Sequence, residues 1–142
     1  MWDMSPYEHV EVDAPDAIVV AALREALRSR GITEYAVVDH GHDMAAAGVT
    51  PHPAWTLVFG NPAAGAALLD RELTAAVDIP LRLAVIGRGG ERSAIVIRPM
   101  RTLLGEQHAD LADRFTAVLR ALADEARASA ERATGPGPAS PP

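Results

Sequence analysis

Residues 55–65 read Trp-Thr-Leu-Val-Phe-Gly-Asn-Pro-Ala-Ala-Gly, and this stretch decides the fold. Trp55 to Phe59 is an apolar run of strand length. Gly60 ends the run, Asn61 is a favourable helix cap, and Pro62 fits the first turn of a helix. The stretch therefore predicts a buried strand, a tight turn and a helix.

Three further elements are predicted before this stretch. Tyr35 to Asp39 is typical of a strand, and it ends in the polar segment Asp39–Asp43, followed by a short Ala-rich turn. Earlier in the chain, Asp13–Asp16 offers a capping acid and an early proline, which predict a helix that stops at Gly31. Weak alternation over Tyr7–Val12 predicts the first strand.

The chain after residue 65 completes the pattern. Leu81–Ile86 and Ser93–Arg98 are predicted to pair through a hairpin turn at Gly87–Gly90. A final helix extends to about Arg132, and its apolar stripe consists of Leu111, Phe115, Val118, Leu119, Leu122 and Ala126. The order of elements predicts an α+β fold with about five mainly antiparallel strands and helices packed on one face.

Length and composition favour one soluble domain. The 142 residues suit a single domain, which we expect over residues 1–134, and the Pro/Gly-rich tail 135–142 is predicted to be disordered. The absence of cysteine excludes disulfides and thiol catalysis and fits a cytoplasmic protein. All thirteen basic residues are arginines, which is typical of a GC-rich bacterial genome.

The charge and hydropathy patterns exclude two classes of partner. The formal net charge of −6 disfavours nucleic acid, although arginines gather between Arg82 and Arg101. No apolar stretch approaches the ~20 residues of a membrane span, and the acidic N-terminus does not fit a signal peptide. We therefore expect neither a nucleic acid nor a membrane as partner.

Three segments together resemble the domain-of-unknown-function family DUF302. They are Val38-Asp39-His40 followed by residues 45–49, the stretch 55–65, and Val77-Asp78-Ile79-Pro80-Leu81-Arg82. The ordered set covers roughly residues 13–122, and it is more specific than each piece alone. The resemblance implies a compact domain with a curved antiparallel sheet, similar to the TATA-binding-protein class of folds. It implies no activity.

The best candidate site is the helix start after Phe59. The N-terminus of a helix presents free N–H groups and a positive dipole end, and Gly60 gives a ligand close access to the backbone. Gly60 and Asn61 are therefore candidate ligands of a small anion. The alternative is that Asn61 only caps its own helix.

Asp39 and His40 are candidate catalytic residues. A carboxylate beside an imidazole can orient a general base, although neighbours on a strand point to opposite faces. Both residues equally suit hydrogen bonds to loop backbone. A metal site built from His40, His42, Asp43 and His52 is a weaker alternative, and we expect no metal and no cofactor.

Asp78 and Arg82 are candidate ligand-binding residues, or a structural pair at a turn. We expect Asp39, His40, Gly60, Asn61 and Asp78 to converge at one end of the sheet. The sequence contains no complete nucleophile, base and oxyanion set. The leading hypothesis is a domain that binds a small anionic ligand and forms a homodimer. The alternative is a small hydrolase- or isomerase-like enzyme with His40 as general base near Asn61.

Overall fold

The computed structural model of the chain describes residues 5–136. These residues form the strands β1 (Glu8–Val12), β2 (Thr33–Asp39), β3 (Ala54–Gly60), β4 (Leu81–Gly89) and β5 (Arg92–Ile97). The α-helices of the same region are α1 (Asp16–Ser29), α2 (His40–Ala46), α3 (Pro62–Arg71), α4 (Arg101–Leu104) and α5 (Ala109–Thr134). Short 3₁₀ helices, η1 (Leu73–Asp78) and η2 (Glu106–His108), connect some of them.

The strands form one antiparallel sheet in the order β1-β5-β4-β3-β2. In the β2–β3 pair, Asp39 lies opposite Trp55 and Thr33 lies opposite Gly60. In the β3–β4 pair, Phe59 lies opposite Leu81. The end of β3 therefore meets the start of both neighbouring strands. The predicted α+β class is confirmed.

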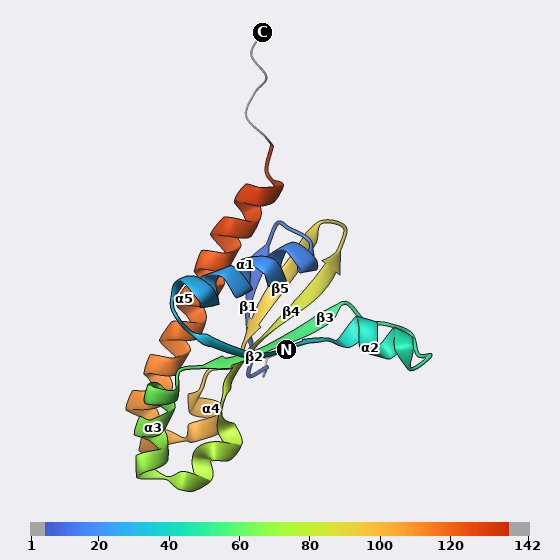
Figure 1. Ribbon diagram of the computed structural model, residues 1–142. Coiled ribbons are helices and arrows are strands. Elements are labelled where there is room, and N and C mark those ends of the chain that lie inside the picture. Colours follow the sequence, from blue (N-terminus) through green and yellow to red (C-terminus); the bar gives the residue numbers. More distant parts are fainter. Residues whose placement is uncertain (1–4, 137–142) are drawn as a thin grey trace.

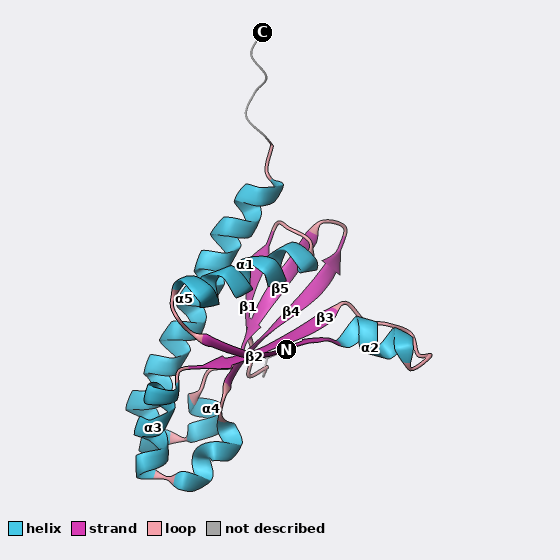
Figure 2. Cartoon of the chain, viewed as in Figure 1, coloured by secondary structure: helices cyan, strands magenta, loops and turns pink. Residues whose placement is uncertain are grey.

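One face of the sheet carries the core. Alternate residues of the central strands are buried, among them Leu57, Phe59, Leu83, Val85, Ile95 and Ile97. These side chains pack against the apolar faces of α1 and α5, which cross the same side of the sheet (Figures 1 and 2). The predicted stripe of α5 is confirmed: Leu111, Phe115, Leu119, Leu122 and Ala126 are buried, and Val118 packs against the core in part.

Helix α1 begins differently from the prediction. Pro15 is its N-cap residue and no side chain caps the first turn, so the expected capping acid is not used. Asp16 instead accepts a hydrogen bond from the indole Nε1 of Trp55 at 3.0 Å. This bond ties the start of α1 to the start of β3, which explains why the acid at this position is turned toward the sheet.

Helix α2 replaces the polar end and Ala-rich turn that the sequence suggested. It projects away from the sheet at the end of β2 and buries none of its residues (Figure 1). Asp39 caps it by accepting a hydrogen bond from the backbone N–H of His42 at 2.9 Å. The helix forms because Asp39 caps its first turn and because it ends in the good helix formers Met44, Ala45 and Ala46.

The predicted hairpin between the last two strands is present, but its turn lies at Gly90 and Glu91. Strand β4 runs on to Gly89 through an irregularity in its pairing with β5. Gly89 and Gly90 have φ angles of 87° and 60°, which favour glycine. Gly87 lies against Pro53, with its N–H 2.7 Å from the Pro53 carbonyl oxygen.

None of the helices within residues 5–136 is long and apolar enough to cross a bilayer. From residue 137 onward, the tail that the sequence predicts to be disordered lies outside the described residues.

Candidate functional site

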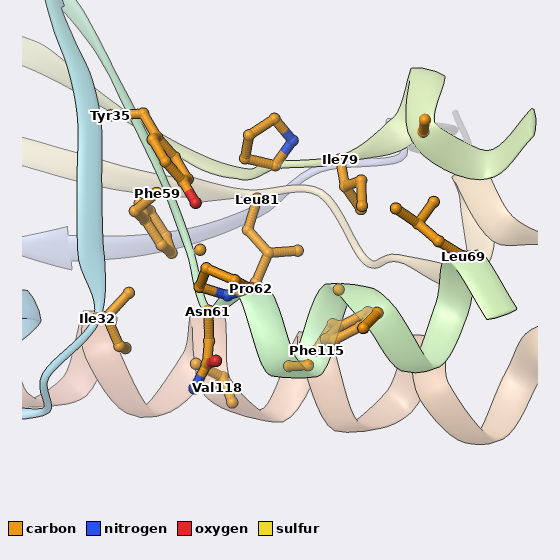
Figure 3. A pocket seen from close by; sticks show the side chains of 16 residues that line it. Ile32, Tyr35, Phe59, Asn61, Pro62, Leu69, Ile79, Leu81, Phe115 and Val118 are labelled. Atoms are coloured by element: carbon orange, nitrogen blue, oxygen red, sulfur yellow. The ribbon is translucent and has the colours of Figure 1, made fainter. Parts of the chain in front are cut away.

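A cavity of about 580 Å³ lies where the end of β3 meets α3 and α5. It is lined by side chains from several elements, including Phe59 of β3, Leu69 of α3, Leu81 of β4, and Phe115 and Val118 of α5 (Figure 3). Ligand pockets of proteins usually enclose about 300–1,000 Å³. The space is therefore large enough for a small organic molecule.

The lining is apolar with two exceptions. Tyr35 and Asn61 are the lining residues whose side chains carry polar groups. Both are exposed, and Tyr35 retains 52% of its accessible surface. Phe59 and Phe115, in contrast, are buried at 1% and 8%. The open end of the cavity is the part lined by the exposed Tyr35 and Asn61, whereas Phe59 and Phe115 are buried parts of its wall.

Several aliphatic lining residues are only half-buried. They are Ile32, Leu69, Ile79, Leu81 and Val118. Figure 3 shows Ile79 and Leu69 on one side of the space, with Phe115 and Val118 along α5 on the other. A molecule placed between these two sides would cover their remaining apolar surface.

Gly60 shapes the open end of the cavity. A Cβ atom at this position would lie 3.5 Å from the Tyr35 ring and 3.8 Å from Pro80, so both side chains pack over the glycine. Both are ordinary van der Waals distances, so the two rings do not by themselves require a glycine at this position. Gly60 also lines the space, and its role in the close approach of a ligand stays a prediction.

Asn61 caps α3, as the sequence predicts. Its Oδ1 accepts a hydrogen bond from the backbone N–H of Ala63 at 3.0 Å, and Pro62 occupies the first turn. The first N–H groups of a helix lack carbonyl partners within it, and the dipole there favours a negative group. Because Asn61, Pro62, Ala64 and Gly65 line the cavity, this helix end faces it.

An ion pair fixes α3 against α5 below the cavity. The guanidinium of Arg71 contacts both carboxylate oxygens of Asp110, at 2.8 and 2.7 Å. The hydrogen bonds from Arg71 hold the pKa of the Asp110 carboxyl well below its usual range. Both side chains are solvent-exposed, so the pair contributes orientation more than stability.

Asp39 and His40 do not lie at this cavity. Asp39 caps α2, and the Nε2 atom of His40 is hydrogen-bonded to the Thr56 hydroxyl at 2.7 Å. The bond of Asp39 is to backbone, as in the structural alternative for this pair, whereas His40 bonds to a side chain of β3 and not to backbone. The first bond provides a partner for a free N–H group at the start of α2, and the second provides a partner for the half-buried ring of His40.

The expected convergence on one cleft is wrong. Asp39 is opposite Trp55 and Thr33 is opposite Gly60, so Asp39 and Gly60 lie near opposite ends of the β2–β3 pair. Gly60 lies five positions after Trp55 along β3, which corresponds to roughly 16 Å at ~3.3 Å per residue. An antiparallel pair places the end of one strand beside the start of the next. His40 therefore cannot serve as a base near Asn61, and the enzyme hypothesis loses its stated geometry.

Asp78 and Arg82 lie near the end of β3 but line a different cavity, of about 380 Å³. Arg82 is opposite Val58 in the β3–β4 pair, on the sheet face that points away from the core. No ion pair joins Asp78 to Arg82. Pro80 and Leu81 line both cavities and separate them.

Within residues 5–136, no group of three or more His, Asp or Glu side chains is placed to hold a metal ion. The cluster of His40, His42, Asp43 and His52 is therefore not assembled.

Sequence reasoning missed most of the cavity. Ile32, Tyr35, Ile79 and Phe115 come from three separate segments, and only tertiary packing brings these segments together. One usable signal was Tyr35, a large aromatic side chain near the start of its strand. It lies near Gly60 because β2 and β3 are antiparallel neighbours.

The fold and the cavity define a small α+β domain with helices on one sheet face and an apolar pocket at one sheet end. The chain belongs to the family "Domain of unknown function DUF302", whose model matches residues 8–133. It is also similar to the crystal structure of an uncharacterised conserved DUF302 protein from Bacillus stearothermophilus. That likeness has a TM-score of 0.77 and 21% identity, and it covers 85% of this chain and 98% of the other. No curated protein matches the chain significantly.

Proposed function

We propose that this domain binds a small molecule with an apolar body and one polar or anionic end in the cavity beside α3. The observation that supports this most is the lining itself: apolar side chains throughout, with Tyr35 and Asn61 at the open end. A pocket with a few convergent polar groups in an apolar wall is typical of a small-molecule site. The apolar lining adds an apolar body to the small anionic ligand that the sequence led us to expect.

The orientation of the ligand follows from burial. Its apolar part lies against the buried ring of Phe115 and the half-buried aliphatic side chains of the wall, such as Leu69. Its polar end lies near the first turn of α3, where the helix dipole favours a carboxylate. The proposal needs no catalytic group, and the domain acts as a binding module.

A series of straight-chain carboxylates from butyrate to octanoate tests this proposal by calorimetry. Each buried CH₂ group contributes about 0.8 kcal/mol, so each added carbon should tighten Kd roughly fourfold until the cavity is filled. Octanol should bind more weakly than octanoate because it lacks the charge at the helix end. Affinity that does not change with chain length would contradict the proposal.

Two variants on the same helix provide a matched control. Ala64 lines the cavity and Ala67 does not, and both are exposed residues of α3. Ala64→Phe places a ring in the space and should abolish octanoate binding, whereas Ala67→Phe should leave it unchanged. Equal binding by both variants would place the ligand elsewhere. Thermal unfolding of each variant checks that the fold is retained.

Self-association is a second proposal, supported by the sheet face opposite the core. Val38, Val58 and Ile86 alternate with core residues of β2, β3 and β4, and they line neither cavity. They are half-buried, and the described helices α1 and α5 pack on the other face. A stable dimer buries about 800 Å² per partner, so the exposed edge strand β2 would have to take part.

Light scattering after size exclusion tests this second proposal. We expect a dimer mass for the wild-type chain and a monomer mass for Ile86→Lys, because a buried unpaired ammonium is unfavourable. A monomer in the wild type, or an unchanged dimer in the variant, would contradict an interface at this face. The ligand proposal does not depend on the outcome.

A further inference from the structure

Two arginines lie on the sheet face that points away from the core and line the same cavity. Leu83 and Ile97 are buried on the core side, so Arg82 of β4 and Arg98 after β5 alternate to the other side. The pairing of β4 with β5 begins at Ala84 opposite Val96, two residues along the chain from each arginine. Both arginines line the cavity of about 380 Å³.

Neither guanidinium has a carboxylate partner among the described residues. Arg98 lies over the ring of Tyr7, 5.6 Å from its centroid, and Arg82 has no hydrogen bond or ion pair. Many other arginines of the chain are paired, such as Arg71 with Asp110 and Arg120 with Glu8. Like charges that share one cavity repel each other. In a chain of net charge −6, two unneutralised neighbours therefore indicate a place for an anion.

The cavity around the two arginines has an apolar wall as well. Val77 and Leu103 line it and retain 83% and 36% of their accessible surface, and the buried Met100 lies beside them in the lining. The floor consists of small or β-branched side chains of the sheet, including Ala84 and Val96. Asp78 is the carboxylate in the lining. The space is larger than a bare inorganic anion needs.

We propose that this second cavity binds an organic phosphate, a monoester whose phosphoryl group lies across Arg82 and Arg98. Guanidinium groups match phosphate oxygens in bidentate geometry, and two adjacent forks suit a dianion. The carbon part of the ester lies against Val77 and Leu103. Asp78 accepts a hydrogen bond from a hydroxyl or amine of that part, which offsets its repulsion of the phosphate. This site is separate from the cavity beside α3 and does not depend on ligand binding there. Because Arg82 lies opposite Val58, the site shares a sheet face with the proposed dimer interface.

Calorimetry with phenyl phosphate and with inorganic phosphate, at low ionic strength, tests the proposal. Phenyl phosphate should bind to the wild-type chain and should bind more tightly than inorganic phosphate because its ring covers the apolar wall. Arg82→Gln and Arg98→Gln should each weaken phenyl phosphate binding by about tenfold or more, which is the usual loss for a charge-assisted hydrogen bond.

Arg132→Gln is the matched control, since it removes the same charge from an exposed arginine of α5 that has no ion-pair partner. It should leave the affinity unchanged, as should Ala64→Phe in the cavity beside α3. No binding by the wild type would overturn the proposal. So would equal losses in all three arginine variants, which would show only a general charge effect. Equal affinities for phenyl phosphate and inorganic phosphate would contradict the proposal that the carbon part of the ester binds to the apolar wall.

Discussion

The side chain of Phe115 provides the sharpest test of how α5 packs. The ring is 8% exposed, it lies on the buried stripe of α5, and one side of it faces the cavity beside α3. Replacing a fully buried Phe by Ala costs about 3–5 kcal/mol. Because the cavity already removes some contacts from the ring, we expect Phe115→Ala to lower the free energy of unfolding by about 3 kcal/mol, the lower end of that range.

Urea unfolding followed by circular dichroism measures this loss. The midpoint should shift while the slope of the transition stays unchanged, because the variant alters stability and not the surface exposed on unfolding. Arg114→Ala, one residue earlier and exposed, should change the free energy by at most about 0.5 kcal/mol. A loss below about 1 kcal/mol for Phe115→Ala would show that this part of α5 does not pack on the core.

Three smaller predictions concern hydrogen bonds. Asn61→Ala should cost about 1 kcal/mol in urea unfolding through the lost cap of α3, and an unchanged midpoint would contradict that cap. Trp55→Phe should cost about 1 kcal/mol by removing the indole bond to Asp16, and the loss should vanish in an Asp16→Ala background. The hydrogen bond from Arg101 lowers the pKa of the Asp113 carboxyl. Such a group stabilises the fold above its unfolded pKa of about 4, and this contribution is lost as the pH falls through the folded value. The melting temperature of Asp113→Asn should therefore fall less on acidification than that of the wild type, and parallel curves would contradict this.

Local signals predicted the elements well. Asn61 and Pro62 mark the start of α3 because capping depends on residues within one turn. The α5 stripe was readable because a helix that packs on a core repeats its apolar side chains at a fixed spacing. Helix α2 was missed because it is short and buries nothing, so it leaves no apolar periodicity in the sequence.

The candidate site was predicted less well, for two physical reasons. Asp39 and Gly60 were both assigned to strand ends, but in an antiparallel pair these two ends lie apart. That error was avoidable, because the same sequence already indicated antiparallel strands. The lining of the cavity was not predictable, since Ile32, Ile79 and Phe115 meet only through tertiary packing. Strand alternation alone places Arg82 and Arg98 on one sheet face. That the two side chains line one cavity could not be predicted from the sequence.

The central claim is that an amphipathic molecule binds in the cavity beside α3. A titration of the ¹⁵N-labelled chain with octanoate, followed by the amide resonances, tests it most directly. The account predicts saturable shifts at Gly60, Ala64 and Gly65, which line the cavity, and none at His40 or His42 near the far end of β2. Shifts confined to the region of His40, or no saturable shifts at all, would contradict it.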